Sequence, residues 1–530
     1  MANKLQLKQV LGKTAFYGNG DPTGIFYNEN RSRMALASRY DLYSWEGREI
    51  GATRRLLRYR VSLYDTTNWN RLGVLDSWYP VNDISFHPLE PVIAVSTGSY
   101  DGGYIYDGKL MIWDYVLNQS HSVFEESRKV VSARFNERGD ELTFILSPRD
   151  DEEERNYKCN FHYCTGKFMT GLSLKDLKPV GTSEMKRMVP TIRERKQIKE
   201  RLTEELIQLS ADYEYRSNAW CVKWVNQDEL IVSGEAPYLE KWTEGSREKV
   251  YHLYARGVQL FLSTNHDRIY LNSEEMELHP EFQMEFPVSY FASFKLSSLD
   301  PIHKHKLVLP FALNQNKEGL FFLKSCADQD RPSKDMLFNH EIQIVEEWPA
   351  EHISQVVQTD EQKDFYYWFK EQNQKFIVKR NPDTQVEQTY SLVEPKSLIQ
   401  EDYKISPDQV QVRGEEYIVS ARIFHPQDFD WSTTKGIIYS MTLTGETNWI
   451  YHLDGHVIAL CYTNQTDTMV FSTSTGQIGI LSAKTGELID IQDVWIDHGR
   501  SMILSLDTYE NRIVAGTVDG LVLIYNYEVK

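Results

Sequence analysis

Apolar and polar positions alternate along much of the chain with a period of two residues, in short runs that end at turn-forming residues. The stretch from Val81 to Tyr115 shows the pattern most clearly. Residues 83–87 alternate and end at Pro88, because proline cannot donate a hydrogen bond to a β-ladder. Residues 92–97 are almost continuously apolar and β-branched, as expected for a strand that is covered on both faces. Residues 109–115 add a third strand, so the stretch predicts consecutive antiparallel strands.

The same rhythm recurs before and after this stretch, in groups of three or four strands. The first group consists of the predicted strands 25–27, 34–38, 61–64 and 71–75. Equivalent positions recur after about 49 residues (Phe86 to Phe135) and about 44 residues (Tyr462 to Leu506), which is the period of four-stranded propeller blades. The groups number about nine, one of them weakly patterned, so we favour eight blades and leave seven or nine open.

The stretch also resembles one blade of the WD-repeat family. Its first strand ends at His87-Pro88, its second is built of small and branched residues, and its third ends in Trp113-Asp114. Gly455-His456 heads a later group in the same manner. The resemblance implies an all-β fold, a single β-propeller over residues 1–530, that serves as a binding scaffold. It also implies that Trp113 lies between neighbouring blades.

The two ends of the chain predict how the ring closes. The last group, within residues 501–527, has three strands and then the chain stops. Residues 4–11 alternate like a strand but have no hairpin partner nearby. We therefore expect the N-terminal strand to complete the last blade, which leaves no exposed sheet edge at the join.

Two segments depart from the strand rhythm. Residues 183–210 predict a helical insertion, with one apolar stripe formed by Ile198, Leu202, Leu206 and Leu209. The stripe needs a cover, which is either the propeller itself or another protein. Residues 240–285 mix tyrosines with charged and turn residues, and their pattern fits either a long insertion or part of another blade.

Charged runs supply the candidate partner-binding residues. The basic candidates on the predicted helix are Arg193, Arg195, Lys196, Lys199 and Arg201. The acidic candidates form a predicted hairpin tip and are Asp150, Asp151, Glu152, Glu153 and Glu154. Such runs are most often solvated faces, and their alternative role is to bind a partner of opposite charge.

The net charge of −18 argues against nucleic acid or an anionic membrane as the main partner, since phosphate contacts need a basic surface. The five cysteines are an odd number spread over 530 residues, which does not indicate a disulfide framework. The first residues lack the apolar segment of a signal peptide, and no run of apolar residues is long enough to span a bilayer. We expect a cytoplasmic protein.

Motifs for catalysis are absent from the sequence, including the nucleophile elbow, the phosphate-binding loop and the zinc helix. Cys159, His162 and Cys164 give too few ligands for a structural zinc site, and lysines flank His303 and His305 as on a solvated edge. We therefore predict no catalytic residues, metal or cofactor. The predicted function is a non-catalytic protein-interaction scaffold within a multi-protein assembly. The alternative is an enzyme or small-ligand-binding propeller that uses the central channel mouth.

Overall fold

The structure is a computed structural model. It describes residues 5–40, 59–99, 107–124, 126–148, 155–162, 180–184, 192–252, 255–265, 267–279, 284–307, 311–325, 334–349, 354–357, 364–371, 374–384, 386–392, 404–424, 435–463 and 465–528. In these ranges the chain forms ten four-stranded antiparallel sheets, one two-stranded hairpin and one α-helix. This architecture confirms the predicted all-β fold built from four-stranded propeller blades.

Three of the sheets come first in the chain. The first sheet comprises β2 (Asp21–Tyr27), β3 (Arg33–Arg39), β4 (Tyr59–Asp65) and β5 (Arg71–Ser77). The second comprises β6 (Val81–Phe86), β7 (Val92–Thr97), β8 (Leu110–Asp114) and β9 (Gln119–Ser122). The third comprises β10 (Val130–Phe135), β11 (Glu141–Leu146), β12 (Arg155–His162) and β13 (Gly181–Glu184). We call these sheets, together with helix α1 (Ile192–Leu209), the arm.

Trp113 lies between the first two arm sheets, as the resemblance implied. Its side chain is 1% exposed and packs with Val61 of β4 and Ile84 of β6. A Cβ atom at Gly73 of β5 would come within 2.9 Å of the Trp113 ring atom Cζ2. Only glycine at that position lets the indole approach so closely.

Helix α1 covers the opposite face of the first arm sheet. Leu206 is fully buried and packs with Met34 and Leu36 of β3, and Leu202 is also buried. Both faces of β3 are therefore covered, by the second sheet on one side and by α1 on the other. The sequence left open whether the propeller itself or another protein covers the apolar stripe. In the structure, the first arm sheet of the same chain covers it.

The other seven sheets, which we call the ring, follow α1. Their strands are β14 (Cys221–Trp224), β15 (Glu229–Ser233), β16 (Leu239–Thr243) and β17 (Ser246–Tyr251); β18 (Ala255–Leu262), β19 (Arg268–His279), β20 (Met284–Lys295) and β21 (Pro301–Leu307); β22 (Phe311–Gln315), β23 (Phe321–Ser325), β24 (Lys334–Phe338) and β25 (Ile344–Pro349); β26 (Ser354–Val357), β27 (Phe365–Glu371), β28 (Gln374–Arg380) and β29 (Glu387–Ser391); β30 (Lys404–Arg413), β31 (Glu416–Phe424), β32 (Lys435–Thr442) and β33 (Thr447–Leu453); β34 (Val457–Thr463), β35 (Thr468–Thr473), β36 (Gln477–Ser482) and β37 (Leu488–Asp493); and β40 (Ile503–Tyr509), β41 (Arg512–Thr517), β42 (Val522–Tyr527) and β1 (Leu5–Leu11). The hairpin β38 (Trp495–Ile496) and β39 (Gly499–Arg500) precedes β40.

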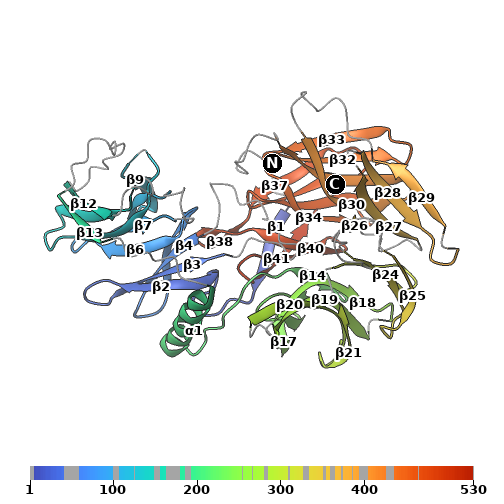
Figure 1. Ribbon diagram of the computed structural model, residues 1–530, viewed down its shortest axis with the longest axis horizontal. Coiled ribbons are helices and arrows are strands. Elements are labelled where there is room, and N and C mark those ends of the chain that lie inside the picture. The colour runs from blue at the N-terminus through green and yellow to red at the C-terminus, as the bar shows by residue number, and fades with distance from the viewer. Residues whose placement is uncertain are drawn as a thin grey trace.

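Hydrophobic clusters join each ring sheet to the next, and the last sheet to the first. In the cluster that completes the cycle, Val514 and Val522 of the last sheet pack with Val222 and Val232 of β14 and β15. Figure 1 shows the arm, from blue strands to the dark green helix α1, beside the ring, which is green to red apart from the blue β1. The arm is therefore inserted between β1 and the rest of the ring.

The predicted pairing of the N-terminal strand with the last group is observed. β1 pairs antiparallel with β42, from Leu5 opposite Tyr527 to Leu11 opposite Val522. Leu5 and Leu11 are 1% and 3% exposed, so the strand is anchored at both ends. In Figure 1 this blue strand lies among the red strands of the last sheet.

Residues 240–285, predicted as an uncertain insertion or part of a blade, belong to two sheets. They supply most of β16, all of β17 to β19, and the start of β20. The alternating pattern is hidden there because β17 is exposed along almost its whole length. Because these residues contribute to two sheets, the described residues form ten four-stranded sheets in all. The sequence favoured eight blades in a single ring and left seven or nine open. The prediction of one domain over residues 1–530 stays a prediction.

Candidate protein-binding site

The outward face of α1 carries the predicted basic residues but is not uniformly basic. Arg195 and Lys196 are exposed next to Glu194, and Glu200 and Glu204 are exposed further along the helix. The side chain of Arg193 lies outside the described residues. A helix face of mixed charge has no strong preference for an acidic partner. The role of these residues in partner binding therefore stays a prediction.

Two of the basic candidates already have partners within the arm and its return segment. Lys199 Nζ lies 2.8 Å from Asp21 Oδ1 and donates to the Tyr215 hydroxyl at 2.8 Å. Burial alone would raise the pKa of Asp21, but Lys199 and the Tyr215 hydroxyl lower it below its usual range. Arg201, which is largely exposed, lies 3.8 Å from Glu205 one helical turn away. Lys199 thus fastens the helix to β2.

Several other predicted residues fall outside the described structure. The acidic candidates Asp150, Asp151, Glu152, Glu153 and Glu154 are among them, as is Cys164 of the disfavoured zinc set. The two disfavoured histidines lie on β21, an outer strand, as a solvated edge requires. His303 Nε2 lies 3.1 Å from Glu341 Oε2, whereas the His305 ring packs against Phe338. The two imidazoles therefore have separate partners.

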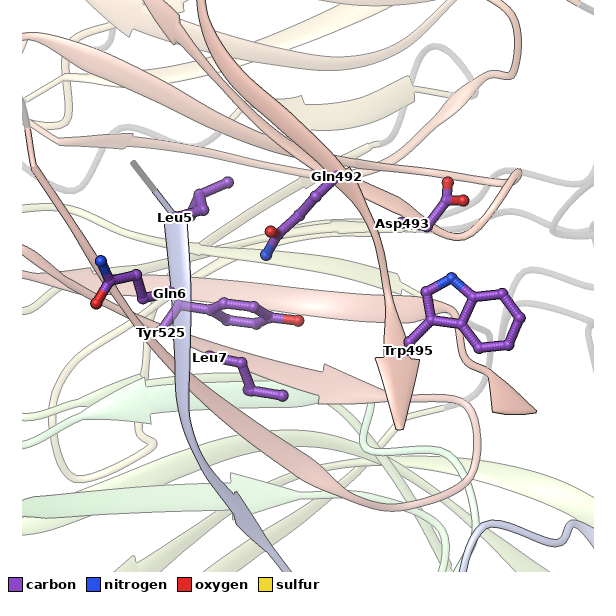
Figure 2. A pocket seen from close by; sticks show the side chains of 7 residues that line it. All are labelled: Leu5, Gln6, Leu7, Gln492, Asp493, Trp495 and Tyr525. Atoms are coloured by element: carbon purple, nitrogen blue, oxygen red, sulfur yellow. The ribbon is translucent and has the colours of Figure 1, made fainter. Parts of the chain in front are cut away.

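A groove at the seam where the chain closes the ring is a second candidate site. It is a pocket of about 540 Å³ between β1, β37 and the hairpin β38–β39. Leu5 and the buried Tyr525 ring form its apolar floor, and Leu7 (38% exposed) and Trp495 (50% exposed) stand at its rim. Figure 2 shows the β1 side chains following one another along the strand, with Trp495 on the opposite side.

The geometry of a propeller explains why a groove forms there. Neighbouring sheets radiate from a common axis, so their outer strands lie farther apart than their inner strands. β1 and β37 are the outer strands of neighbouring sheets, and few contacts join them. One of these joins the Leu5 backbone N–H to Asp490 Oδ2 at 2.8 Å. The space between the two strands beyond this contact is the groove.

Trp495 is presented by the hairpin β38–β39 rather than by a blade. Ile496 of this hairpin is buried in the core of the closing sheet, whereas Trp495 points out of it. The Arg500 guanidinium lies 5.5 Å from the Trp495 ring centroid and 2.6 Å from Asp493 Oδ2. Arg500 therefore joins the tryptophan to the acidic end of β37.

The arm fixes the position of this hairpin. The buried Arg60 of β4 donates to the Arg500 carbonyl oxygen at 2.6 Å and is paired with Asp76 at 2.7 Å. Burial alone would lower the pKa of Arg60, but the Asp76 carboxylate raises it, so the guanidinium stays charged. Arg71 of β5 donates to the Ile496 carbonyl oxygen at 3.3 Å. Two buried arginines of the arm thus hold the backbone that carries Trp495.

Trp495 was not among the predicted partner-binding residues, because all of those were taken from runs of charged residues. The one sequence feature that marks Trp495 is its position between a predicted strand and a short turn that ends at Gly499. Nothing in that pattern separates an exposed aromatic residue from one buried in the core. Its exposure depends on packing between sheets that lie far apart in the sequence.

Within the described ranges, no group of three or more His, Cys, Asp or Glu side chains is arranged to hold a metal ion. Among the same residues, no helix combines the length and apolar character needed to cross a membrane.

No protein-family model matches the sequence, and no curated protein matches it. Among solved structures, the chain is similar to BBS1N in complex with ARL6DN, soaked with lead, at 12% identity and a TM-score of 0.41, covering 60% of this chain and 94% of that one. It is also similar to the WD40 beta propeller domain of Doa1, at 14% identity and a TM-score of 0.40, covering 60% and 95%. The fold described above rests on the sheet topology itself.

Proposed function

We propose that the chain is a non-catalytic protein-interaction scaffold that works as a subunit of a multi-protein assembly in the cytoplasm. The observation that carries this proposal is the half-exposed Trp495 at the rim of the groove. Tryptophan is among the residues most enriched at the centres of protein–protein interfaces, because it buries a large apolar area and loses little conformational freedom.

The groove is also held in place before any partner arrives. Its walls are strands of two packed sheets, and the hairpin with Trp495 is anchored by Arg60 and Arg71 of the arm. A site that is already ordered spends less of its interaction energy on ordering when it binds. This rigidity suits a scaffold, whose partners dock on a fixed surface.

The experiment compares tagged wild-type protein with a Trp495→Ala variant by affinity purification and quantitative mass spectrometry from the cells that make the protein. The matched control is Leu89→Ala, which removes an apolar side chain that is 80% exposed on the arm. We expect the wild type and the control to recover the same stable set of proteins and Trp495→Ala to lose its principal member.

Two outcomes would contradict the proposal. If Trp495→Ala retains every protein that the wild type recovers, the groove is not the binding site. A triple variant of Arg195, Lys196 and Arg201 then tests the predicted surface on α1. If the wild type is recovered alone, the scaffold function is wrong. The alternative, an enzyme or small-ligand-binding propeller that uses the central channel mouth, is then the function to test.

A further inference from the structure

The groove has the shape of a linear cleft. Leu5, Gln6 and Leu7 are consecutive on β1, and Gln492 and Asp493 end β37 on the other side. Two strands therefore form its long walls. A volume of about 540 Å³ accommodates a few side chains rather than a folded domain. A cleft of this form fits a short extended segment of chain.

The inner part of the groove selects an apolar side chain. Leu5 and Tyr525 are 1% and 2% exposed at its floor, and Leu7 adds a partly exposed aliphatic wall. Burial raises the pKa of the Tyr525 hydroxyl, so it stays neutral and adds no charge to the floor. The apolar surface exposed there belongs to Leu7, and an aliphatic or aromatic side chain placed against it removes apolar surface on both molecules from water.

The outer part of the groove selects a cation. Asp493 is the one charged side chain among the residues that line the pocket, and it is 32% exposed. A carboxylate has about four acceptor sites, so its contacts with Arg500 and Gln477 leave room for another donor. The Trp495 ring already has the Arg500 guanidinium 5.5 Å from its centroid, and half of its surface is exposed for a second cation.

We infer that the groove binds an extended peptide segment of a partner protein in which an apolar side chain is followed closely by a lysine or arginine. The apolar side chain lies against Leu7, above the buried floor of Leu5 and Tyr525. The basic side chain lies beside Arg500, where it reaches the remaining acceptor sites of Asp493 and the exposed surface of Trp495. The net charge of −18 attracts such a basic segment over a longer range. This inference rests on the proposed function and specifies its partner.

The test uses the purified full chain and a phage-displayed library of random peptides about twelve residues long. We expect enriched peptides to share an apolar residue next to a lysine or arginine. Synthetic versions should bind Trp495→Ala and Leu7→Ser at least about tenfold more weakly than wild type, as expected for residues at the centre of an interface. Leu89→Ala should bind as wild type does, and circular dichroism should show that all variants are folded.

A double-mutant cycle tests the charge directly. Asp493→Asn should weaken binding of the basic peptide about threefold to tenfold, and more at low salt. The same substitution should leave almost unchanged the binding of a peptide in which alanine replaces the basic residue, because the partner of the carboxylate is then missing.

Three outcomes would overturn the inference. Enriched peptides could lack a basic residue, or could bind Trp495→Ala as tightly as wild type. The third outcome is that no peptide is enriched, although the recovery of partner proteins from cells still depends on Trp495. That result overturns the peptide inference and leaves the scaffold function standing, since the partner would then present a folded surface. The failure of the proposed scaffold function is separate, because it is recognised when the wild-type chain is recovered from cells alone.

Discussion

Asp507 Oδ2 accepts a hydrogen bond from the Trp224 backbone N–H at 2.7 Å, although the two residues are 283 positions apart. Asp507 lies on β40, the inner strand of the last ring sheet, and Trp224 lies on β14, the inner strand of the first. Within the arm, Asp83 of β6 binds the backbone N–H of Ala133 on β10 in the same way. The last ring sheet thus joins β14 with the same kind of contact that joins the second arm sheet to the third, and this contact does not involve the arm.

Asp507→Ala should weaken this join. The carboxylate is buried, and hydrogen bonds to charged groups contribute about 1.5 to 3 kcal/mol, so we expect a loss of that size in the free energy of unfolding. Urea titration followed by circular dichroism measures it. Asp212→Ala, at an exposed position, is the control and should change the free energy by less than about 0.5 kcal/mol. Equal effects of the two substitutions would contradict the role of Asp507.

Two tryptophans in contrasting environments test the packing of the arm. Trp113→Ala should cost about 3 to 5 kcal/mol, the range for removing a buried aromatic side chain, because Trp113 fills the space between two sheets. Trp495→Ala should cost less than about 1 kcal/mol, since the ring is half exposed. Denaturant titration of both variants makes the comparison. A loss below about 1 kcal/mol for Trp113→Ala would place that residue at the surface.

Glu240 supports a prediction about pH. It is 1% exposed and lies 2.6 Å from Arg216 and 3.0 Å from Arg247. Burial alone would raise the pKa of Glu240, but the two arginines lower it below its ordinary 4.5. The pKa is therefore lower in the folded state than in the unfolded state. The stability from the ionised carboxylate is present above about pH 4.5 and is lost as the pH falls through the folded-state pKa.

Glu240→Gln should accordingly destabilise the protein most at neutral pH. Leaving Arg216 without its buried partner costs about 3 to 5 kcal/mol. Unfolding of both proteins, measured from about pH 7 down to about pH 3, should show a constant difference to about pH 5 and a narrowing difference below about pH 4.5. A difference that widens as the pH falls would show that the sign of the pKa shift is wrong.

Local patterns predicted the elements well. The alternation in residues 83–87 predicted β6, the apolar run in residues 92–97 predicted β7, and the stripe with Leu202 and Leu206 predicted α1 with its buried face. The lone strand at the N-terminus predicted its own pairing with β42, because an alternating strand without a neighbour requires a distant partner. Each of these predictions started from a pattern of residues that are close together in the sequence, even where the partner strand is distant.

The division into arm and ring was not predictable in this way. Strands of the arm and of the ring have the same two-residue period, so the sequence gives each sheet the same signature. The division depends on contacts such as that of Val514 with Val222, which are almost three hundred residues apart. The groove was missed for the same reason, since its walls come from opposite ends of the chain.

The central claim is that the ring is complete without the arm and is closed by β1. A shortened chain tests it, in which residues 1–13 are joined by a short Gly/Ser linker to residues 214–530. Its matched control consists of residues 214–530 alone, which lack β1. Removing the arm uncovers the cluster around Trp220 and Met502, so some loss of melting temperature is expected.

The decisive measurement is thermal unfolding of the two shortened chains, followed by circular dichroism and light scattering. We predict that the chain with β1 shows a β-sheet spectrum and one cooperative transition, because every ring sheet keeps both of its neighbours. The chain without β1 should aggregate or melt at a much lower temperature, since the edge of β42 is then exposed. If both chains unfold or aggregate alike, the ring does not stand without the arm, and the account is contradicted.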